Sequence, residues 1–263
     1  DNILGPGINI HRHPLNGRNF EYFSEDPLVS GKMAAAELRG LKKQGVTGTL
    51  KHFAANNQEK KRHDVDSIVS ERALREIYLK SFEIAVKEAQ ADSVMTTYGR
   101  LNGVWTAGRY ELNTTILRNQ WGFTGIVMTD WWAKINNQSG TKGVGNDFAS
   151  MVRAQNDIYM VCPQGDENRT DDNTLKELAA GTLTRGELQR SATNICRQLM
   201  SLPAFARLNG ETETVEILHK PEDKSDFDIE NIAYYTFDEK GEIPMDGIDT
   251  SKGSSFVFAI DVP

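Results

Sequence analysis

Short apolar segments alternate with longer helical patterns over the first two-thirds of this chain, and this alternation restricts the fold more than any other feature. The apolar segments are nearly continuous, which is typical of strands buried on both faces of a parallel sheet. Helices between such strands cover the sheet, either in an eight-stranded α/β barrel or in a doubly wound sheet. The sequence therefore predicts an α/β protein, and the alternation alone leaves these two arrangements open.

Five segments have the length and composition of buried strands and are bounded by turn residues. They are residues 7–10, 46–53, 92–98, 125–130 and 156–163. An α/β barrel needs eight strands. A barrel formed by this chain would therefore be incomplete and would lack its first strands.

Helical patterns occupy much of the sequence between the expected strands. One covers residues 28–44, which are rich in strong helix formers and are followed by Gly45. Another covers residues 70–89 and begins at Ser70, a favourable N-cap residue. Its expected buried face consists of Leu74, Ile77, Tyr78, Phe82 and Ala85. Further helices are expected over residues 109–121, 174–180 and 184–207.

The pattern of apolar and polar residues changes after about Leu208. From there on, three β-prone segments are separated by polar linkers, and no helical period remains. We therefore predict two parts, a partial barrel over residues 1–207 and a β-rich module over residues 208–263. The last β-prone segment runs directly into Pro263, and the first residues resemble protein interior. On this basis we expect the natural chain to extend beyond both ends.

The composition excludes several classes of protein. The 263 residues carry a net charge of −7, whereas a general nucleic-acid binder needs a basic face. No apolar run is long enough to cross a bilayer and no signal peptide opens the chain, so no membrane partner is expected. Cytoplasmic and secreted locations both stay open, and a homo-oligomer is compatible with the sequence.

Neither a metal site nor a cofactor is expected. Cys162 and Cys196 lie far apart, so we interpret them as free, buried thiols rather than as a zinc or CxxC site. His11 and His13 are close in sequence, but a single such spacing without carboxylate partners is poor evidence for a metal pair.

Charged and aromatic residues gather where the expected strands end, which is the edge at which parallel α/β folds place active sites. They are Arg18, Lys51, His52, Tyr98 and Asp130. Asp130 is the most informative, because a carboxylate is rarely left beside an apolar strand and two tryptophans unless it is paired or used.

These residue types suit a sugar substrate. Aromatic faces stack on sugar rings, while cationic side chains bind hydroxyls and lower the pKa of a nearby carboxylate. An ionised aspartate can attack an anomeric carbon and form a glycosyl-enzyme, if a second carboxyl about 5–5.5 Å away acts as acid and base.

Five segments resemble, in order and spacing, the barrel domain of glycoside hydrolase family 3, the β-glucosidase group. They are "GRNFEYFSEDP", "KHFAANNQE", "SERALREIYL", "VMTTYGRLNG" and "GFTGIVMTDWW", within residues 4–163. The resemblance implies an eight-stranded α/β (TIM) barrel. It also implies a retaining exo-β-glucosidase that acts on terminal β-D-glucosyl residues of short β-linked oligosaccharides such as cellobiose.

The resemblance also implies roles for individual residues. Asp130 is the expected nucleophile, and Trp131 shapes the sugar subsite. Arg18, Lys51 and His52 are expected to bind hydroxyls of the terminal sugar. Arg18 has an alternative interpretation as an ion pair with Glu21 or Glu25.

Three further residues complete the expected site. Tyr98 is placed beside the nucleophile, although Gly99 stands where the family usually has asparagine. Arg62 is expected to support Tyr98 or the substrate, and Met95 to form part of the wall. Trp132 is equally suited to packing in the wall or to contacting sugar.

Two features of the family are absent from this chain. The acidic sugar-binding residue of an early "DGP" motif would lie before Asp1, and nothing resembles the α/β sandwich domain that supplies the acid/base glutamate. We expect the missing strands and the acid to come from another segment or a second chain. Two alternatives stay open, a β-xylosidase of the same family and a non-catalytic carbohydrate-binding fragment.

Overall fold

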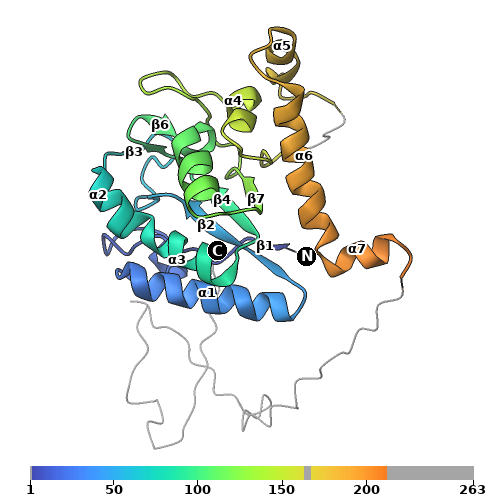
Figure 1. The fold of residues 1–263 in the computed structure, drawn as a ribbon. Coiled ribbons are helices and arrows are strands. Elements are labelled where there is room, and N and C mark those ends of the chain that lie inside the picture. Colours follow the sequence, from blue (N-terminus) through green and yellow to red (C-terminus); the bar gives the residue numbers. More distant parts are fainter. Residues whose placement is uncertain (1, 163–166, 212–263) are drawn as a thin grey trace, which may run out of the picture. The chain divides into compact units, whose positions relative to one another are not determined.

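A parallel four-stranded sheet lies at the centre of the computed structural model, which describes residues 2–162 and 167–211 (Figure 1). Its strands are β1 (Asn2–Ile3), β2 (Thr47–Phe53), β4 (Ser93–Thr96) and β7 (Ile126–Met128). They are neighbours in the order β1-β2-β4-β7, and every pair is parallel. The prediction of an α/β fold with a parallel sheet is confirmed.

Three of the five expected strands, 46–53, 92–98 and 125–130, are present as β2, β4 and β7. The prediction of a strand over residues 7–10 is wrong. There the chain makes only an isolated bridge between Gly7 and Lys51, although Ile8 is fully buried. Pro6 has no amide hydrogen and so cannot donate to a regular ladder, which explains why β1 ends before it.

The expected strand at residues 156–163 is also reduced to a single parallel bridge, between Met128 and Ile158. The amide of Thr129 donates to the Ile158 carbonyl at 2.9 Å, so this segment still follows the edge of β7. The apolar residues of this segment correctly indicated that it is buried. They did not indicate that its backbone departs from a regular strand.

A second, three-stranded sheet was not expected from the sequence. It contains β3 (Asp66–Ser67), β5 (Arg100–Leu101) and β6 (Val104–Trp105), with β5 and β6 antiparallel. The two residues between β5 and β6, Asn102 and Gly103, have φ angles of 50° and 87°. An Asn-Gly pair with positive φ at both positions is the preferred two-residue hairpin loop, so this signal was present in the sequence.

Most helices lie where helical patterns were expected, but the helix over Phe148–Arg153 was not expected, and the helix expected over residues 184–207 is interrupted between Met200 and Pro203. In chain order they are α1 (Pro27–Lys43), α2 (Glu71–Ala73), α3 (Lys80–Ala89), α4 (Phe148–Arg153), α5 (Thr174–Ala179), α6 (Arg185–Met200) and α7 (Pro203–Leu208). A π-helical segment, η2 (Leu74–Tyr78), separates α2 from α3, and a second one, η4 (Glu111–Gln120), precedes β7. Short 3₁₀ turns, η1 (Asn19–Glu21) and η3 (Thr106–Gly108), complete the described elements.

The wider winding of η2 explains one wrong detail of the expected buried face. Leu74, Phe82 and Ala85 are buried, but Ile77 is 40% exposed. A π-helical turn contains more residues than an α-helical turn, so it rotates the side chains that follow out of the α-helical period.

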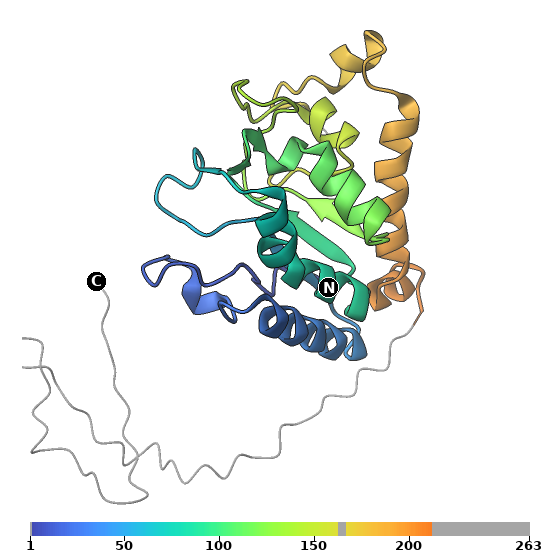
Figure 2. The same ribbon diagram turned by 60° about the vertical axis from the view of Figure 1, so that its left-hand side comes forward.

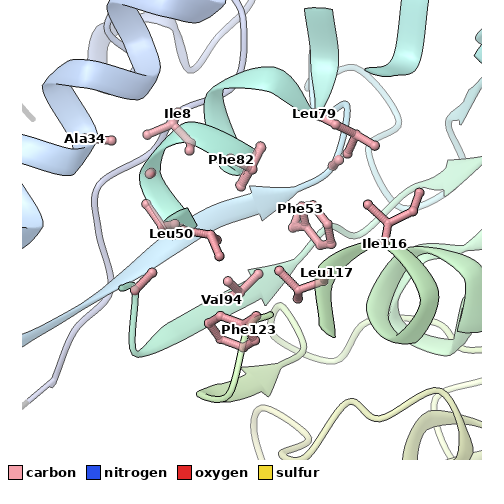
Figure 3. Close-up of a cluster of buried hydrophobic side chains, with 14 of the residues drawn as sticks. Ile8, Ala34, Leu50, Phe53, Leu79, Phe82, Val94, Ile116, Leu117 and Phe123 are labelled. Carbon is pink, nitrogen blue, oxygen red and sulfur yellow. The ribbon is translucent and has the colours of Figure 1, made fainter. Parts of the chain in front are cut away.

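The main hydrophobic core lies between one face of the sheet and the helices α1, α3 and η4 (Figure 3). Leu50, Val94 and Val127 are neighbours in the strand register and point into this core. Sequential strand order in a parallel sheet is typical of a barrel. Ile195 of α6 nevertheless packs against the cluster of Met95, Ile126 and Met128, which alternates with the core-facing residues. Closure into an incomplete eight-stranded barrel therefore stays a prediction.

Met95 and Met128 alternate with the core-facing valines and lie in a separate apolar cluster with Ile126. The loops that follow residues 10 and 53 project from the same side of the molecule (Figure 2).

The two cysteines lie away from this core. Both cysteines are free, but Cys196 is exposed and Cys162 is half-buried, so the prediction of buried thiols is wrong. The buried positions of α6 are the polar residues Ser191, Asn194 and Gln198, and Cys196 lies outside that face.

Apart from residues 208–211, the expected β-rich module lies outside the described residues. Among the described helices, none combines the length and apolar character that a membrane span requires.

Two glycines on α1 provide a test of how closely this helix packs. A Cβ atom at Gly31 would lie 2.8 Å from Cβ of Ile84 on α3, whereas one at Gly40 would meet nothing within 4 Å. We expect Gly31→Ala to lower the free energy of unfolding by about 1–3 kcal/mol, because the added methyl overpacks the helix contact. Gly40→Ala should instead raise it by about 0.5–1 kcal/mol through helix propensity. Urea unfolding of both variants measures this, and equal effects at both positions would contradict the close packing.

Candidate active site

The expected site residues meet at the carboxyl ends of β2, β4 and β7. Lys51 and His52 belong to β2, Tyr98 follows β4, and Asp130 follows β7. Parallel strands in register place these ends at one edge, so residues about 80 positions apart in sequence share one site.

Asp130 presents one carboxylate oxygen without a partner. Its side chain is only 6% exposed. Oδ1 accepts a hydrogen bond from the amide of Trp131 at 2.8 Å. Oδ2 is buried and has no hydrogen-bond partner among the described residues. It lies 3.8 Å from Nε2 of His52. An unsatisfied buried carboxylate oxygen is costly and indicates a functional role.

Asp157 shows what a structural buried carboxylate looks like in the same molecule. Its Oδ2 accepts from Arg118 at 2.7 Å and from the amide of Val127 at 3.0 Å, and its Oδ1 accepts from Asn194 at 3.1 Å. Both oxygens are therefore satisfied. The contrast between the two aspartates separates a carboxylate that joins elements from one that is left available.

Burial raises the pKa of Asp130 above its ordinary value. The Trp131 amide, the Tyr98 phenol and the charges of Arg18 and Arg62 oppose this shift without cancelling it. We expected cationic neighbours to give this carboxylate a lowered pKa, and that prediction is wrong. The arginines do lower the pKa, but desolvation raises it by more.

His52 is a neutral imidazole held at its backbone. Its amide donates to Oδ1 of Asn9 at 2.8 Å, and Nδ2 of Asn9 donates to the His52 carbonyl at 2.9 Å. Burial, followed by the nearby charges of Arg18, Lys51 and Arg62, holds the pKa of His52 well below its usual value. His52 can therefore serve as a neutral hydrogen-bond partner at physiological pH.

Glu21 joins two of the expected sugar-binding cations. Its Oε1 pairs with Nε of Arg18, and its Oε2 lies 3.0 Å from Nζ of Lys51. The alternative ion pair of Arg18 with Glu21 is thus present, and it also orders Lys51. Burial opposes ionisation of Glu21, but the bonds from Arg18 and Lys51 lower its pKa overall. Sequence reasoning considered Glu21 only as a partner of Arg18 and missed this bridging position.

Arg62 packs against Tyr98, one of its two expected positions. Its guanidinium lies 4.6 Å from the centre of the Tyr98 ring, and Nη1 is 2.9 Å from Oε2 of Glu59. The His63 ring, 4.2 Å away between centroids, also contacts Tyr98. Burial and the neighbouring Asp130 carboxylate raise the pKa of Tyr98 to about 12, so its phenol keeps its proton.

The apolar part of the site combines Met95 and Trp131. Met95 is fully buried, and the partly buried Trp131 packs against the cluster that contains it. Trp132 is 65% exposed and has a φ angle of 53°, so it does not pack in this wall.

Other polar residues that the sequence singled out have structural partners. His11 Nε2 bonds to the carbonyl of Tyr22 at 2.9 Å, and Nδ1 of His13 accepts from the amide of Leu15 at 3.1 Å. Glu59 bonds to Arg62 and to Asn56. Within residues 2–162 and 167–211, no group of three or more His, Cys, Asp or Glu side chains is placed to hold a metal ion.

Replacing Asp130 should raise stability where it is ionised. A carboxyl whose pKa is raised in the folded state favours folding below its unfolded pKa, and this contribution is lost as the pH rises through the folded pKa. At pH 7 we therefore expect Asp130→Asn to increase the free energy of unfolding by about 1 kcal/mol, and the gain to vanish at acid pH.

Asp157→Asn is the matched control for that change, since it alters a buried carboxylate that is fully bonded. It should destabilise the fold by about 2 kcal/mol or more. Denaturant titrations at pH 4 and pH 7 decide the question, and a loss of stability for Asp130→Asn at pH 7 would refute the unpaired state of Oδ2.

Glu21 should show the opposite pH dependence. Its pKa is lowered in the folded state, so its contribution is present at neutral pH and is lost as the pH falls through the folded pKa. Glu21→Gln should lower the free energy of unfolding by about 1 kcal/mol at pH 7, with a smaller effect at acid pH. Glu25→Gln, at an exposed neighbour, should leave stability unchanged at both. Equal effects of the two variants in the same titrations would count against the bridge.

Comparison with known proteins shows the family. The model described as the glycosyl hydrolase family 3 N terminal domain matches residues 1–198. A beta-glucosidase of Ruminococcus albus is 58% identical over 262 residues, which is 100% of this chain and 27% of that protein. An exo-alpha-(1->6)-L-arabinopyranosidase of Bifidobacterium breve is 44% identical over 190 residues, which is 72% of this chain and 23% of that protein.

A solved structure of a beta-glucosidase from Paenibacillus barengoltzii is similar with a TM-score of 0.77 and 61% sequence identity. The similarity covers 82% of this chain and 23% of that one. The chain thus spans about a quarter of the length of the proteins it matches. The family model covers most of the chain and includes all the strands and site residues described above, so this chain belongs to glycosyl hydrolase family 3.

Proposed function

We propose that this chain carries the nucleophile and most of the sugar-binding residues of a retaining exo-β-glucosidase. The observation that carries the proposal is the buried Oδ2 of Asp130, which has no partner in the described residues and faces His52. Arg18 and Lys51 lie within the same group of side chains through their shared bonds to Glu21. A single available carboxylate oxygen next to neutral and cationic donors suits attack on a sugar whose hydroxyls are held in place.

The proposed reaction has two steps. Oδ2 of Asp130 attacks the anomeric carbon of a terminal β-D-glucosyl residue, the glycosidic bond breaks, and the departing oxygen takes a proton from an acid. A covalent glucosyl ester forms on Asp130. Water then attacks the same carbon, gives its proton to the conjugate base of that acid, and releases glucose and the free carboxylate.

The other site residues position the sugar in this scheme. His52, Lys51 and Arg18 hold its hydroxyls, Trp131 and Met95 form the apolar wall, and Arg62 keeps the Tyr98 ring beside the nucleophile. Neutral His52 is suited to this task, since a hydroxyl can both donate to and accept from such a ring. The Tyr98 phenol, which retains its proton, helps to offset the charge of Asp130.

The acid/base glutamate belongs, in this proposal, to a segment outside this chain. Two carboxylates near the expected motifs are engaged, because Glu59 bonds to Arg62 and Asn56, and Glu71 pairs with Arg75. The same outside segment, an α/β sandwich together with the first strands, would complete the barrel of which residues 1–207 form the later part. The β-rich module over residues 208–263 would follow that barrel.

The experiment that tests the nucleophile does not depend on the missing acid. A 2-deoxy-2-fluoro-β-glucoside with a dinitrophenyl leaving group needs no proton to depart, and its fluorine slows hydrolysis of the ester. We expect the chain to acquire one sugar on the peptide that contains Asp130, detected by mass spectrometry after digestion. Asp130→Asn should abolish the label and Asp157→Asn, if folded, should keep it. A label on any other residue, or an unchanged label in Asp130→Asn, would refute the assignment.

The Bifidobacterium breve relative motivates a second candidate substrate, an α-L-arabinopyranoside. Such a sugar, like a β-xyloside, lacks the hydroxymethyl group of glucose. Rates of dinitrophenolate release from matched glucoside, xyloside and arabinopyranoside substrates would rank the three. A xyloside or arabinopyranoside preferred about tenfold or more, a difference of about 1.4 kcal/mol, would replace the glucosidase assignment.

A further inference from the structure

Tyr22 lies behind His52 and belongs to none of the groups assigned above. It is 5% exposed, and its hydroxyl oxygen lies 3.2 Å from Nδ1 of His52. The same oxygen is 3.0 Å from Nδ2 of Asn56 and 3.5 Å from the Asn56 carbonyl. The two rings meet edge to face, with centroids 6.2 Å apart and an interplanar angle of 67°. Tyr22 therefore contacts the rear nitrogen of the histidine that faces the nucleophile.

The neighbours of Tyr22 determine where its proton goes. Nδ2 of Asn56 also donates to Oε1 of Glu59 at 3.0 Å. An ionised carboxylate only accepts, so this bond fixes the orientation of the Asn56 amide and makes Asn56 a donor to Tyr22. Burial raises the pKa of Tyr22, so the hydroxyl keeps its proton. Between the two acceptors in reach, Nδ1 of His52 is closer than the Asn56 carbonyl.

The opposite side of the imidazole favours the same arrangement. Nε2 of His52 faces Oδ2 of Asp130 at 3.8 Å, and that oxygen makes no hydrogen bond of normal geometry with the described residues. A hydrogen on Nε2 is attracted to the carboxylate, whereas a lone pair on Nε2 would be repelled by it. A neutral imidazole carries only one hydrogen, so Nε2 holds it when Nδ1 accepts from Tyr22.

We propose that Tyr22 is a positioning residue that holds His52 in the Nε2–H tautomer, with its N–H directed toward Asp130 and the sugar site. The tautomer follows from contacts on this chain alone. Its benefit to sugar binding rests on the function proposed above. Asn56 and Glu59 extend the same chain of bonds away from the nucleophile, so four side chains in a row orient one N–H group.

The tautomer can be measured without any activity. In the ¹⁵N-histidine-labelled chain, two-bond ¹⁵N–¹H correlations distinguish Nδ1–H from Nε2–H, and His52→Gln identifies the His52 signals among the five histidines. We expect the Nε2–H form in the parent. Tyr22→Phe keeps the ring and removes the donor, so it should shift the tautomer ratio toward Nδ1–H by roughly 3- to 10-fold, the bias expected from one neutral hydrogen bond.

Tyr159→Phe is the matched control. It removes the same atom from a buried tyrosine whose hydroxyl bonds to the Ala133 carbonyl at 3.4 Å, in a core cluster that contains neither Tyr22 nor His52. It should leave the His52 tautomer unchanged. A parent His52 protonated on Nδ1, or a ratio that Tyr22→Phe does not alter, overturns the proposal. If Tyr22→Phe does not fold by circular dichroism, the parent spectrum still decides.

Labelling by the fluorinated glucoside connects the tautomer to the reaction. Tyr22→Phe should slow formation of the glycosyl-enzyme by roughly 3- to 10-fold, while Tyr159→Phe should match the parent. Normal labelling by Tyr22→Phe would remove the functional part of the inference. Absence of labelling in the parent would count against the proposed function and leave the tautomer result standing on the spectra alone.

Discussion

The parallel register of β2, β4 and β7 is the constraint on which the rest of this structure depends. Leu50 pairs with Val94, and Val94 pairs with Val127, so three apolar side chains form one row beneath the helices. Because side chains alternate along a strand, a shift of one residue would move this row to the other face. The same register sets the height at which each strand ends. It therefore decides the packing of the core and brings the strand ends to one edge. The pairing of β2 with β4 shifts register between Leu50 and Phe53, so the positions of Lys51 and His52 also depend on this irregularity.

Asp130 carries an electrostatic cost that the buried carboxylate of Asp157 avoids. Asp157 is buried with both oxygens bonded, whereas Asp130 is buried with Oδ2 unpaired. Desolvation raises the pKa of Asp130 in spite of two nearby arginines. The surrounding side chains are held by bonds among themselves, through Glu21 on one side and Asn56 on the other. This arrangement leaves Oδ2 of Asp130 unpaired while its neighbours are ordered, which is typical of preorganised sites.

Predictions from the sequence failed where local composition does not determine the backbone. Residues 7–10 and 156–163 are apolar and follow the sheet, yet each makes only an isolated bridge to it. The range 70–89 has an apolar period, but its π-helical segment turns Ile77 outward. Cys196 is exposed because α6 directs a polar face inward, which hydropathy alone does not indicate.

The sequence by itself determined the fold class, the positions of most helices and the candidate residues of the site. Strong helix formers, cap residues and continuous apolar strands are local signals, and the motifs at the strand ends indicated Arg18, Lys51, His52 and Asp130 as candidate site residues. Only the tertiary structure decided how these residues are connected. The bridge of Glu21 to Lys51 and the contact of Tyr22 with His52 join segments that are far apart in the chain. The unpaired state of Oδ2 of Asp130 likewise depends on which distant residues surround it. Such contacts depend on strand register and loop path, for which a single sequence carries no local signal.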